Sequence, residues 1–530
     1  MDITKPHSQR WWMPIATVLL AFTVLFGWWH YPELPVTSRI MYSALTVAVS
    51  LLLLLVWFLF FSAFRWRTRL MSLGILVLAV FGFSRLVRMD GAINGSGLPR
   101  VTWKWTPKNT GNVEQSQAIA ARPALSADQA TAGGDYPGFL GSDRSGIVEG
   151  VQLERDWSAH PPQLLWRQPV GLGWSSFAIK GSRTVTQEQR GENELVVCYE
   201  LATGRTLWMH TNHVRFSEKV GGDGPRATPT IAGERVFALG ATGILDCLEL
   251  ADGKPIWSHD TLAENHASNL IWGKSSSPLV LDNLVIISGG QTNGPTLLAY
   301  QRENGSPVWT AGTDEASYSS PTVATLAGHR QVLSLNAASL TAHDPPDGHI
   351  VWQYPWKGWE PRCAQPVALE GNRVLLSAGF GLGSVLLQVK ADAGGKLSAV
   401  EVWKNLRLKT QFASAVVRDG HAYGLDEGVL ACIDLATGER KWKDGHYGFG
   451  QLVLVHDLLL VQTEPGPVAL VEASPAEFRE VGQVNALDSK TWNPPAVAGD
   501  FLLVRNDKEA ICFKLATRSL TAKIVGSLDR

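Results

Sequence analysis

The chain has 530 residues, too many for one ordinary domain, and its charges nearly cancel, with 47 Lys and Arg against 48 Asp and Glu. A formal net charge of −1 offers no basic face of the kind that nucleic-acid binding needs, so we expect no nucleic-acid partner. The 51 glycines and 21 tryptophans recur along the chain, a pattern typical of all-β folds built from blades.

Residues 1–89 contain three apolar runs, which predict a transmembrane anchor with spans at about 13–29, 40–64 and 70–87. The first two runs carry no charge, and each is long enough to cross a hydrocarbon core of about 30 Å. The third run is short and ends near Arg85 and Arg88. The sequence therefore predicts two or three transmembrane helices and leaves the crossing of the third open. A cleaved signal would explain only one such run.

The loop charges indicate an orientation. Arg65, Arg67 and Arg69 lie between the second and third runs, and the positive-inside rule places them in the cytoplasm. If the third run crosses, everything after it is periplasmic or otherwise extracytoplasmic at a bacterial inner membrane. Arg85 and Arg88 count against this orientation, and without the third crossing the soluble part is cytoplasmic.

Residues 90–135 have no apolar periodicity and are predicted to be a flexible linker. Gln115–Gly134 is rich in Ala, Ser, Gln and Gly, a composition typical of a tether. Just before it, Val101–Pro107 contains two tryptophans and is a candidate for docking on a surface. The remaining residues, 136–530, form the predicted soluble domain.

The soluble domain contains a repeat with an apolar strand, a turn ending in Gly, and a Trp four residues after that Gly. Clear copies are Cys198–Gly204 with Trp208, Cys247–Gly253 with Trp257 and Cys432–Gly438 with Trp442. The Gly is expected because a tight hairpin needs a positive φ at that point. The predicted repeat tryptophans are Trp166, Trp208, Trp257, Trp309, Trp352, Trp403 and Trp442.

Between these copies lie eight short segments that pass from small polar residues to an apolar strand, separated by 37–52 residues. A period of this size with four strands in each unit predicts propeller blades. The last repeat, Cys512–Arg518, lacks a following Trp, and an unpaired strand with Trp166 precedes the first. Joining the two removes exposed sheet edges. We therefore predict an all-β, eight-bladed β-propeller closed by N- and C-terminal strands.

The cysteines occupy the repeat as well. Cys198, Cys247, Cys432 and Cys512 stand at the same position of four different blades, so we expect them to be far apart and buried as small apolar residues. Cys363 has no partner.

The repeat resembles the pyrroloquinoline-quinone (PQQ)-type propeller repeat over residues 160–518. That superfamily includes quinoprotein alcohol dehydrogenases and BamB-like propellers of the barrel-assembly machinery. The resemblance implies the fold strongly and the function weakly. It also implies, as an alternative, a PQQ cofactor with calcium in the central channel. The adjacent cysteine pair often found in such dehydrogenases is missing here, and no calcium ligand set stands out.

Residues just ahead of the inner strands are predicted to ring the mouth of the channel. Three cations among several aromatics suit an anionic, planar ligand, although any propeller mouth collects polar loop residues. Glu188 and Asp223 are further polar candidates, with turn residues as the alternative. The candidate ligand-binding residues are Trp174, Glu188, Asp223, Arg226, Lys274, Tyr318, Arg362, Gln411 and Trp492. We predict no catalytic or metal-ligating residue.

The leading hypothesis is a membrane-anchored extracytoplasmic binding or assembly scaffold with protein partners in the cell envelope, since rigid sheets hold variable loops in place. One alternative is a PQQ-dependent dehydrogenase that oxidises an alcohol or sugar and passes electrons to the membrane. Another is a sensor that binds a small ligand in the mouth. Whether the protein is an enzyme is left open.

Overall fold

The computed structural model describes residues 11–31, 34–111, 119–120, 134–291, 294–358 and 361–518, with only the backbone described at 119–120. The chain divides into two compact units, Met1–Lys108 and Asn109–Arg530. Each unit is described by itself below. The predicted tether Gln115–Gly134 falls almost entirely outside the described residues, so its flexibility stays a prediction.

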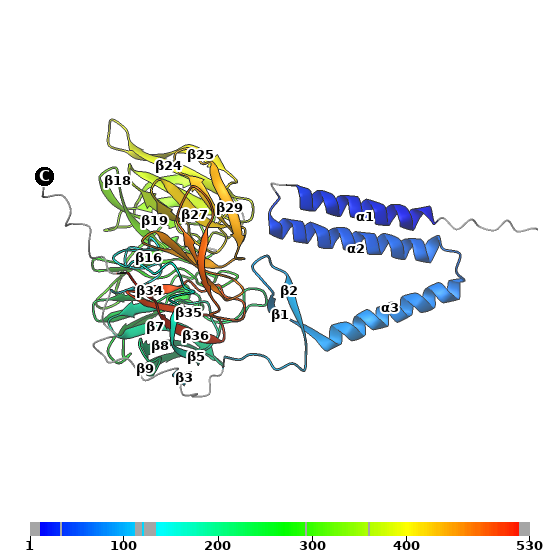
Figure 1. Cartoon of the computed structure of the whole chain (residues 1–530), viewed down its shortest axis with the longest axis horizontal. Coiled ribbons are helices and arrows are strands. Elements are labelled where there is room, and N and C mark those ends of the chain that lie inside the picture. The colour runs from blue at the N-terminus through cyan, green and yellow to red at the C-terminus, as the bar shows by residue number, and fades with distance from the viewer. Residues whose placement is uncertain are drawn as a thin grey trace, which may run out of the picture. The chain divides into compact units, whose positions relative to one another are not determined.

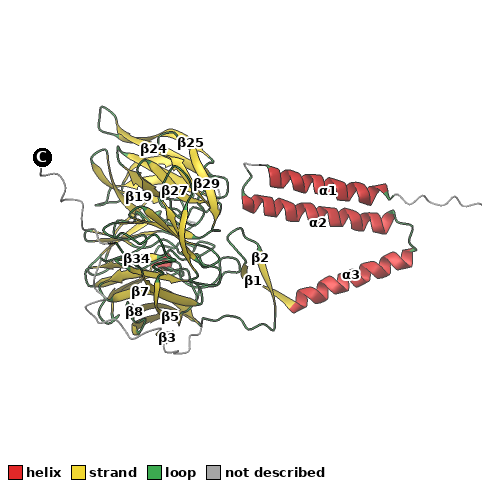
Figure 2. Ribbon diagram, viewed as in Figure 1, coloured by secondary structure: helices red, strands yellow, loops and turns green. Residues whose placement is uncertain are grey.

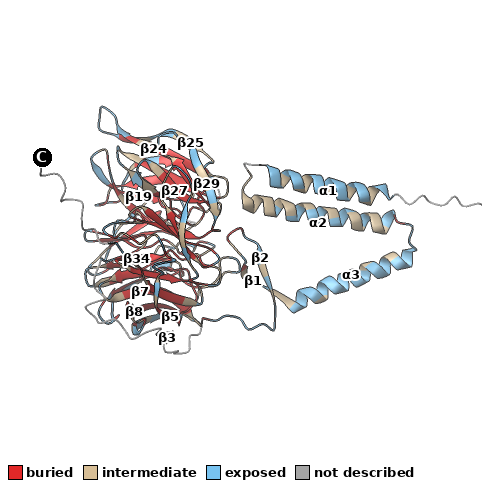
Figure 3. Ribbon diagram, in the orientation of Figure 1, coloured by how far each residue is buried: buried red, intermediate tan, exposed pale blue. Residues whose placement is uncertain are grey.

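The first unit contains three apolar helices, α1 (Trp12–His30), α2 (Val36–Phe60) and α3 (Trp66–Leu86), all long and apolar enough to cross a membrane. Figure 3 shows them as exposed or half-buried along their length, and none of their described residues is buried. Because Pro35 stands directly before α2, that helix begins earlier than its apolar run. The helices α1 and α2 lie side by side, with a hydrogen bond of 3.1 Å from Trp28 Nε1 to Thr46 Oγ1. Apolar helices before the propeller are thus confirmed.

After α3 the chain forms an antiparallel hairpin that begins in the last residues of the predicted anchor and continues into the segment predicted as linker. Its strands are β1 (Val87–Ala92) and β2 (Pro99–Trp103), and the register pairs Val87 with Trp103 and Met89 with Val101. The hydrogen bond from Lys104 N to Leu86 O extends this pairing to the end of α3. The sequence analysis did not anticipate this hairpin, because two short strands give little periodic signal.

The regular secondary structure of the second unit is nearly all strand, arranged as eight sheets in which consecutive strands of a blade are antiparallel neighbours (Figures 1 and 2). The eight-bladed propeller is therefore confirmed. Blades 1 to 4 comprise β6–β9 (Ala178–Lys180, Arg183–Arg190, Asn193–Glu200, Thr206–Asn212), β10–β13 (Thr230–Ala232, Arg235–Leu239, Ile244–Glu249, Pro255–Asp260), β14–β17 (Leu279–Leu281, Leu284–Ser288, Leu297–Gln301, Pro307–Ala311) and β18–β21 (Thr322–Leu326, His329–Leu335, Ser339–His343, Ile350–Pro355). A short helix, α4 (Thr261–Glu264), follows β13.

Blades 5 to 8 continue the ring, and two of them gain a fifth strand from the N-terminal side. They comprise β22–β25 (Val367–Leu369, Arg373–Ala378, Gly383–Ala391, Leu397–Asn405), β26–β29 (Val416–Arg418, His421–Asp426, Val429–Asp434, Arg440–His446), β30–β33 (Gln451–Val455, Leu458–Gln462, Val468–Glu472, Glu480–Val484) with β4 (Ile147–Val148), and β34–β36 (Ala496–Ala498, Phe501–Arg505, Glu509–Lys514) with β5 (Gln163–Pro169) and β3 (Ile119–Ala120).

The ring closes as predicted, by pairing of the two ends of the propeller sequence. Strand β5 is antiparallel to β36, and Trp166 stands opposite Cys512. In three other blades Cys198, Cys247 and Cys432 stand opposite the repeat Trp in the same way. All four of these cysteines are fully buried in separate blades, which confirms their predicted packing role.

Six of the seven repeat tryptophans donate a hydrogen bond that joins one blade to the next. Trp166 Nε1 donates to Leu201 O of blade 1 at 2.8 Å, and Trp208, Trp257, Trp309, Trp403 and Trp442 donate to backbone carbonyls of the following blade in the same way. Trp352 differs, because it donates to Gln331 Oε1 of its own blade.

The glycine of the repeat turn has two roles in this docking. Gly204 has φ +72°, as the turn predicts, and a Cβ at this position would lie 2.8 Å from the Trp166 ring. Gly253 stands in the same relation to Trp208. The repeat therefore needs Gly for its backbone conformation and also because the Trp of the preceding blade lies on it.

Blade 7 has no repeat Trp, since Gly482 occupies that position opposite Leu470. Trp157, from the segment before the propeller ring, packs there instead: a Cβ on Gly482 would lie 3.0 Å from the Trp157 Cβ. Trp157 is 3% exposed and belongs to the same apolar cluster as Leu470. A residue outside the repeat thus completes the apolar packing of this blade.

Candidate functional site

The central axis of the propeller is surrounded by a belt of hydrogen bonds that joins every blade to the next. Typical links run from Ser176 N to Thr228 Oγ1 (3.1 Å) and from Thr228 N to Ser277 Oγ (2.9 Å). The links around the rest of the ring come from Ser277, Gln365, Gln451, Ser176 and Asn493. These residues are buried, so we expect the belt to hold the eight inner strands rigidly around the axis.

The segment that precedes blade 1 crosses several inner strands at residues that follow the belt residues in the chain. Tyr136 pairs with Ile179 of blade 1, Pro137 O accepts from Ile231 N of blade 2, and Gly146 O accepts from Leu454 N of blade 7. Residues 135–148 therefore run from blade 1 across to blade 7. We call this segment the plug.

Arg144 is the buried centre of the plug. Its guanidinium donates to the backbone carbonyls of Ser277, Pro278 and Pro321, on blades 3 and 4. Burial lowers the pKa of this guanidinium to about 9. The plug contacts named here lie at or after the belt positions of blades 1, 2, 3, 4 and 7, whereas the predicted mouth residues precede the belt. The plug and the mouth thus lie on opposite sides of the belt.

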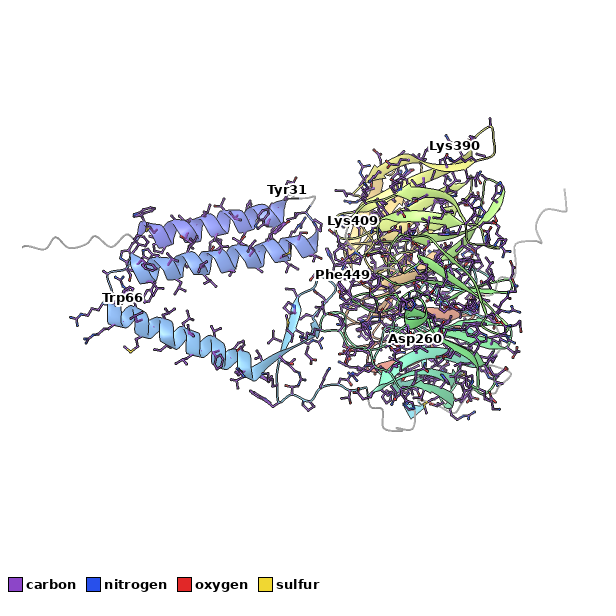
Figure 4. All side chains as sticks on the ribbon, turned by 180° about the vertical axis from the view of Figure 1, so that it is seen from behind. Tyr31, Trp66, Asp260, Lys390, Lys409 and Phe449 are labelled. Carbon is purple, nitrogen blue, oxygen red and sulfur yellow. The ribbon has the colours of Figure 1, made fainter. Side chains whose placement is uncertain are left out.

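At the mouth, aromatic side chains from six blades form two groups. The Trp174 and Trp492 rings are 4.9 Å apart, Trp492 and Phe412 are 5.1 Å apart, and Phe412 and Phe449 are 6.0 Å apart. Phe449 is labelled in Figure 4. This group joins blade 1 to blades 6, 7 and 8.

The second aromatic group is Trp272 with Tyr318, whose rings are 5.5 Å apart. The loop before β10 links the two groups, since Gly221 O accepts from Trp174 Nε1 at 2.7 Å and a Cβ on Gly221 would lie 3.1 Å from Trp272. We call these six residues the aromatic collar: Trp174, Trp272, Tyr318, Phe412, Phe449 and Trp492. All but Trp174 and Phe449 are partly exposed.

The structure thus brings together three of the predicted mouth residues, Trp174, Tyr318 and Trp492. Sequence reasoning missed the other three members of the collar. Phe449 directly precedes the seventh of the eight small-residue segments, and Phe412 follows the predicted Gln411, so the repeat register alone was a usable signal for both. Trp272, two residues before Lys274, had no such marker.

The predicted cations of the mouth bond to the protein's own backbone. Lys274 is fully buried, and its ammonium donates to Ser288 O (2.5 Å), Ser288 Oγ (3.0 Å) and Gly289 O. Burial lowers the pKa of Lys274 to about 7. Arg362 is also fully buried and donates to Ala337 O and, at 2.5 Å, to Trp356 O.

Arg226 lies closer to the collar. Its guanidinium donates to the carbonyls of Gly222 and Gly224 and lies 4.5 Å from the Phe216 ring centroid. Burial lowers the pKa of Arg226 to about 10, against the opposing effect of nearby carboxylates such as Glu218. The three predicted cations therefore stabilise the loops of the mouth.

Glu188 lies inside strand β7 and is fully buried, which excludes the turn interpretation for this residue. It accepts hydrogen bonds from Tyr199 Oη (2.5 Å), Arg190 Nη2 (2.9 Å) and Gly171 N (2.7 Å). Burial by itself raises the pKa of Glu188, but Arg190, Arg505 and these hydrogen bonds outweigh it, so the pKa is lowered. Glu188 is the anionic centre of a closed network.

The remaining two predicted residues lie in loops. Asp223 forms an ion pair of 2.5 Å with Arg215 and accepts from Ser217 Oγ at 2.8 Å, so it closes its own loop. Gln411 is 4% exposed and lies against Gly379. Neither residue joins the collar by a ring contact.

These donor sets do not fit a quinone held over calcium. An anionic quinone needs several cations directed at it, yet the three predicted cations, Arg226, Lys274 and Arg362, donate to backbone carbonyls. In the described part of the chain, one group of at least three His, Cys, Asp or Glu side chains has its ligand atoms within 4.8 Å of one another: Asp344, Asp347 and His349. It lies on the exposed turn between β20 and β21, outside the mouth.

The repeat, the Trp–Gly docking and the closed ring define a class: an eight-bladed propeller of quinoprotein-type repeats joined to apolar helices. The family model described as outer membrane protein assembly factor BamB (PQQ_2) matches residues 160–290, 192–444 and 274–491. These overlapping matches cover more than half of the chain, so the chain belongs to this family. Among curated proteins, none matches it.

Solved structures share the fold at low sequence identity. The quinohemoprotein alcohol dehydrogenase from Comamonas testosteroni matches with TM-score 0.53 and 12% identity, covering 76% of this chain and 86% of its own. The enzyme ADHIIG from Pseudomonas putida HK5 matches with TM-score 0.53 and 14% identity, covering 80% and 85%. BamB from Moraxella catarrhalis matches with TM-score 0.47 and 13% identity, covering 67% and 98%. At these identities the likeness concerns the fold alone.

Proposed function

We propose that this protein is a membrane-anchored scaffold whose propeller presents the aromatic collar to protein partners in the cell envelope. The observation that carries the proposal is a difference between the charged and the aromatic side chains of the mouth. The three predicted cations Arg226, Lys274 and Arg362 bond to backbone carbonyls. The ammonium of Lys490 lies over the Trp174 and Trp492 rings, 5.1 Å and 4.2 Å from their centroids, and four collar aromatics remain partly exposed. Trp and Tyr are enriched among the residues that dominate protein–protein binding energy.

The construction of the channel supports a presenting role. The hydrogen-bonded belt joins the inner strands to one another, and the plug contacts several of them beyond the belt. We expect these contacts to keep the collar loops in one geometry. Binding costs less when the binding groups are already ordered. Membership of a family described as an outer membrane assembly factor supports assembly with other proteins.

The proposed location is the extracytoplasmic side of a bacterial inner membrane. It rests on the three apolar helices together with Arg65, directly before α3, and Arg67 and Arg69, in the first turn of α3, which the positive-inside rule assigns to the cytoplasm.

A photo-crosslinking experiment in native membranes tests the scaffold function. A photoreactive amino acid at Phe412, in the collar, is compared with one at Val308, an exposed residue of the outer strand β17. We expect discrete protein adducts from position 412 that position 308 does not form. A W492A substitution, which removes the ring next to Phe412, should weaken them. Equal adduct patterns at both positions, or none at 412, would contradict the proposal.

A titration tests the dehydrogenase alternative directly. Purified full-length protein is mixed with PQQ and calcium, and binding and dye-linked alcohol oxidation are measured. We expect no saturable binding, because Arg226, Lys274 and Arg362 donate their hydrogen bonds to backbone carbonyls. Saturable binding with oxidation would replace the scaffold by the enzyme.

A further inference from the structure

We propose that the hairpin β1–β2 is a second membrane contact, which lies in the headgroup region of an anionic bilayer directly beside the end of α3. The inference rests on the proposed membrane anchoring of α1–α3. It concerns residues 87–105, which the anchoring proposal does not use.

The hairpin has one apolar and one polar face. Residues on alternate positions of a strand share a face, and the register pairs Val87 with Trp103 and Met89 with Val101. These four residues form the apolar face. Between them lie the residues of the polar face: Arg88, Asp90, Arg100 and Thr102.

The apolar face is open in the structure. Met89 is 57% exposed, Val101 52% and Trp103 45%. Trp105, which stacks on Trp103 at 4.9 Å between ring centroids, is 65% exposed. A two-stranded hairpin is at best marginally stable in water, and exposed apolar side chains of this size favour an apolar neighbour.

Continuity with α3 identifies that neighbour. The hairpin starts at Val87, directly after the last residue of α3, and Lys104 N donates to Leu86 O at 2.8 Å. The Trp103 ring lies edge-on to Phe83 of α3, 6.2 Å between centroids. If α3 crosses a bilayer, this contact places the Trp pair at the level where the hydrocarbon ends.

The composition of the hairpin suits the interface and excludes the hydrocarbon core. Trp rings are enriched where acyl chains meet headgroups. The outer edges of two strands leave backbone groups unpaired, which the hydrocarbon core does not tolerate. Residues 87–108 carry four cations against the single carboxylate of Asp90: Arg88, Arg100, Lys104 and Lys108. Cations beside a membrane helix attract anionic headgroups.

The test places a fluorescent label on either face of the same strand. The full chain carries C363S, which removes the one cysteine that is not fully buried, and then a single engineered cysteine, V101C on the apolar face or T102C on the polar face. The NBD-labelled protein is reconstituted into vesicles of phosphatidylethanolamine and phosphatidylglycerol that contain doxyl-labelled lipid. A third protein, V49C, labels the middle of α2 as a control for membrane insertion.

We expect 5-doxyl lipid to quench the label at 101 about twofold or more above the label at 102, because interfacial elements bury their apolar face about 5–10 Å deep. Replacing phosphatidylglycerol by phosphatidylcholine should reduce this quenching, and an unchanged value would overturn the role of anionic headgroups. Equal quenching at 101 and 102, with V49C quenched by 12-doxyl lipid, overturns the hairpin proposal alone. If V49C itself is not quenched, the membrane anchoring fails as well.

Discussion

Replacing Gly204 by alanine tests how the propeller is closed. Gly204 has φ +72°, and a new Cβ would lie 2.8 Å and 3.0 Å from two ring atoms of Trp166, which comes from the N-terminal strand of the closing blade. The left-handed conformation costs an L-residue about 1–2 kcal/mol. Forcing a methyl group into a packed site adds about 1–3 kcal/mol. We therefore expect G204A to lower the free energy of unfolding by about 2–5 kcal/mol.

Gly181 provides the matched control. It lies in the turn between β6 and β7 with φ +56°, and a Cβ there meets nothing within 4 Å. G181A should therefore show the backbone cost alone, about 1–2 kcal/mol. The difference between the two variants isolates the packing of Trp166 on blade 1.

Urea unfolding of the full chain in detergent, followed by tryptophan fluorescence, measures both variants against the unsubstituted protein. The three helices are identical in all samples, so the comparison reports on the propeller. If G204A and G181A unfold at the same urea concentration with the same slope, the docking of Trp166 on the repeat glycine does not stabilise the ring. The reasoning from the Trp–Gly contact would then be refuted.

Three further predictions concern buried groups. Lys274 has a folded pKa of about 7, below its usual value, so above that pH the unfolded chain binds more protons than the folded chain. The free energy of unfolding should therefore rise with pH from about 7 towards 10. K274M should flatten this rise, measured as the urea midpoint against pH, and an equal pH dependence in both proteins would contradict the prediction. R144M should cost about 1–3 kcal/mol by leaving carbonyls of blades 3 and 4 without their donor. It should also speed amide exchange at Ile231, which bonds to the plug, and unchanged exchange would count against a plug held by Arg144. Maleimide should modify Cys363 first, since the other cysteines are fully buried. Burial also raises the pKa of Cys198 to about 12, so rapid labelling of Cys198 in the folded chain would be inconsistent with the structure.

The blade pattern could be predicted from the sequence because each repeat contains the residues that define its own turn and its packing on the next blade. The Gly turn, the Trp four residues later and the small-residue segment involve neighbours in the chain or in the next blade. The pairing of Trp166 with Cys512 followed from the same pattern, since an incomplete last repeat and an unpaired early strand complement each other. In a repeat protein such nearest-neighbour contacts account for most of the stability.

The directions of the mouth side chains were not readable in this way. Lys274 and Arg362 stand at the predicted positions, yet Lys274 bonds to carbonyls of its own blade and Arg362 to carbonyls of blade 4, because burial leaves no water to satisfy them. Trp157 packs where blade 7 lacks a repeat Trp, although its own loop has no repeat pattern. In the sequence, Gly482 showed only that the repeat Trp is missing from this blade.

The sequence by itself determined the number of blades, the closure of the ring and the presence of apolar helices, since these depend on periodic patterns and run lengths. Only the tertiary structure decided which mouth residues face one another, that Arg144 joins the plug to blades 3 and 4, and that the hairpin after α3 has an exposed apolar face. Those features arise from contacts between segments distant in the chain, and no local pattern specifies the distance or direction between such segments.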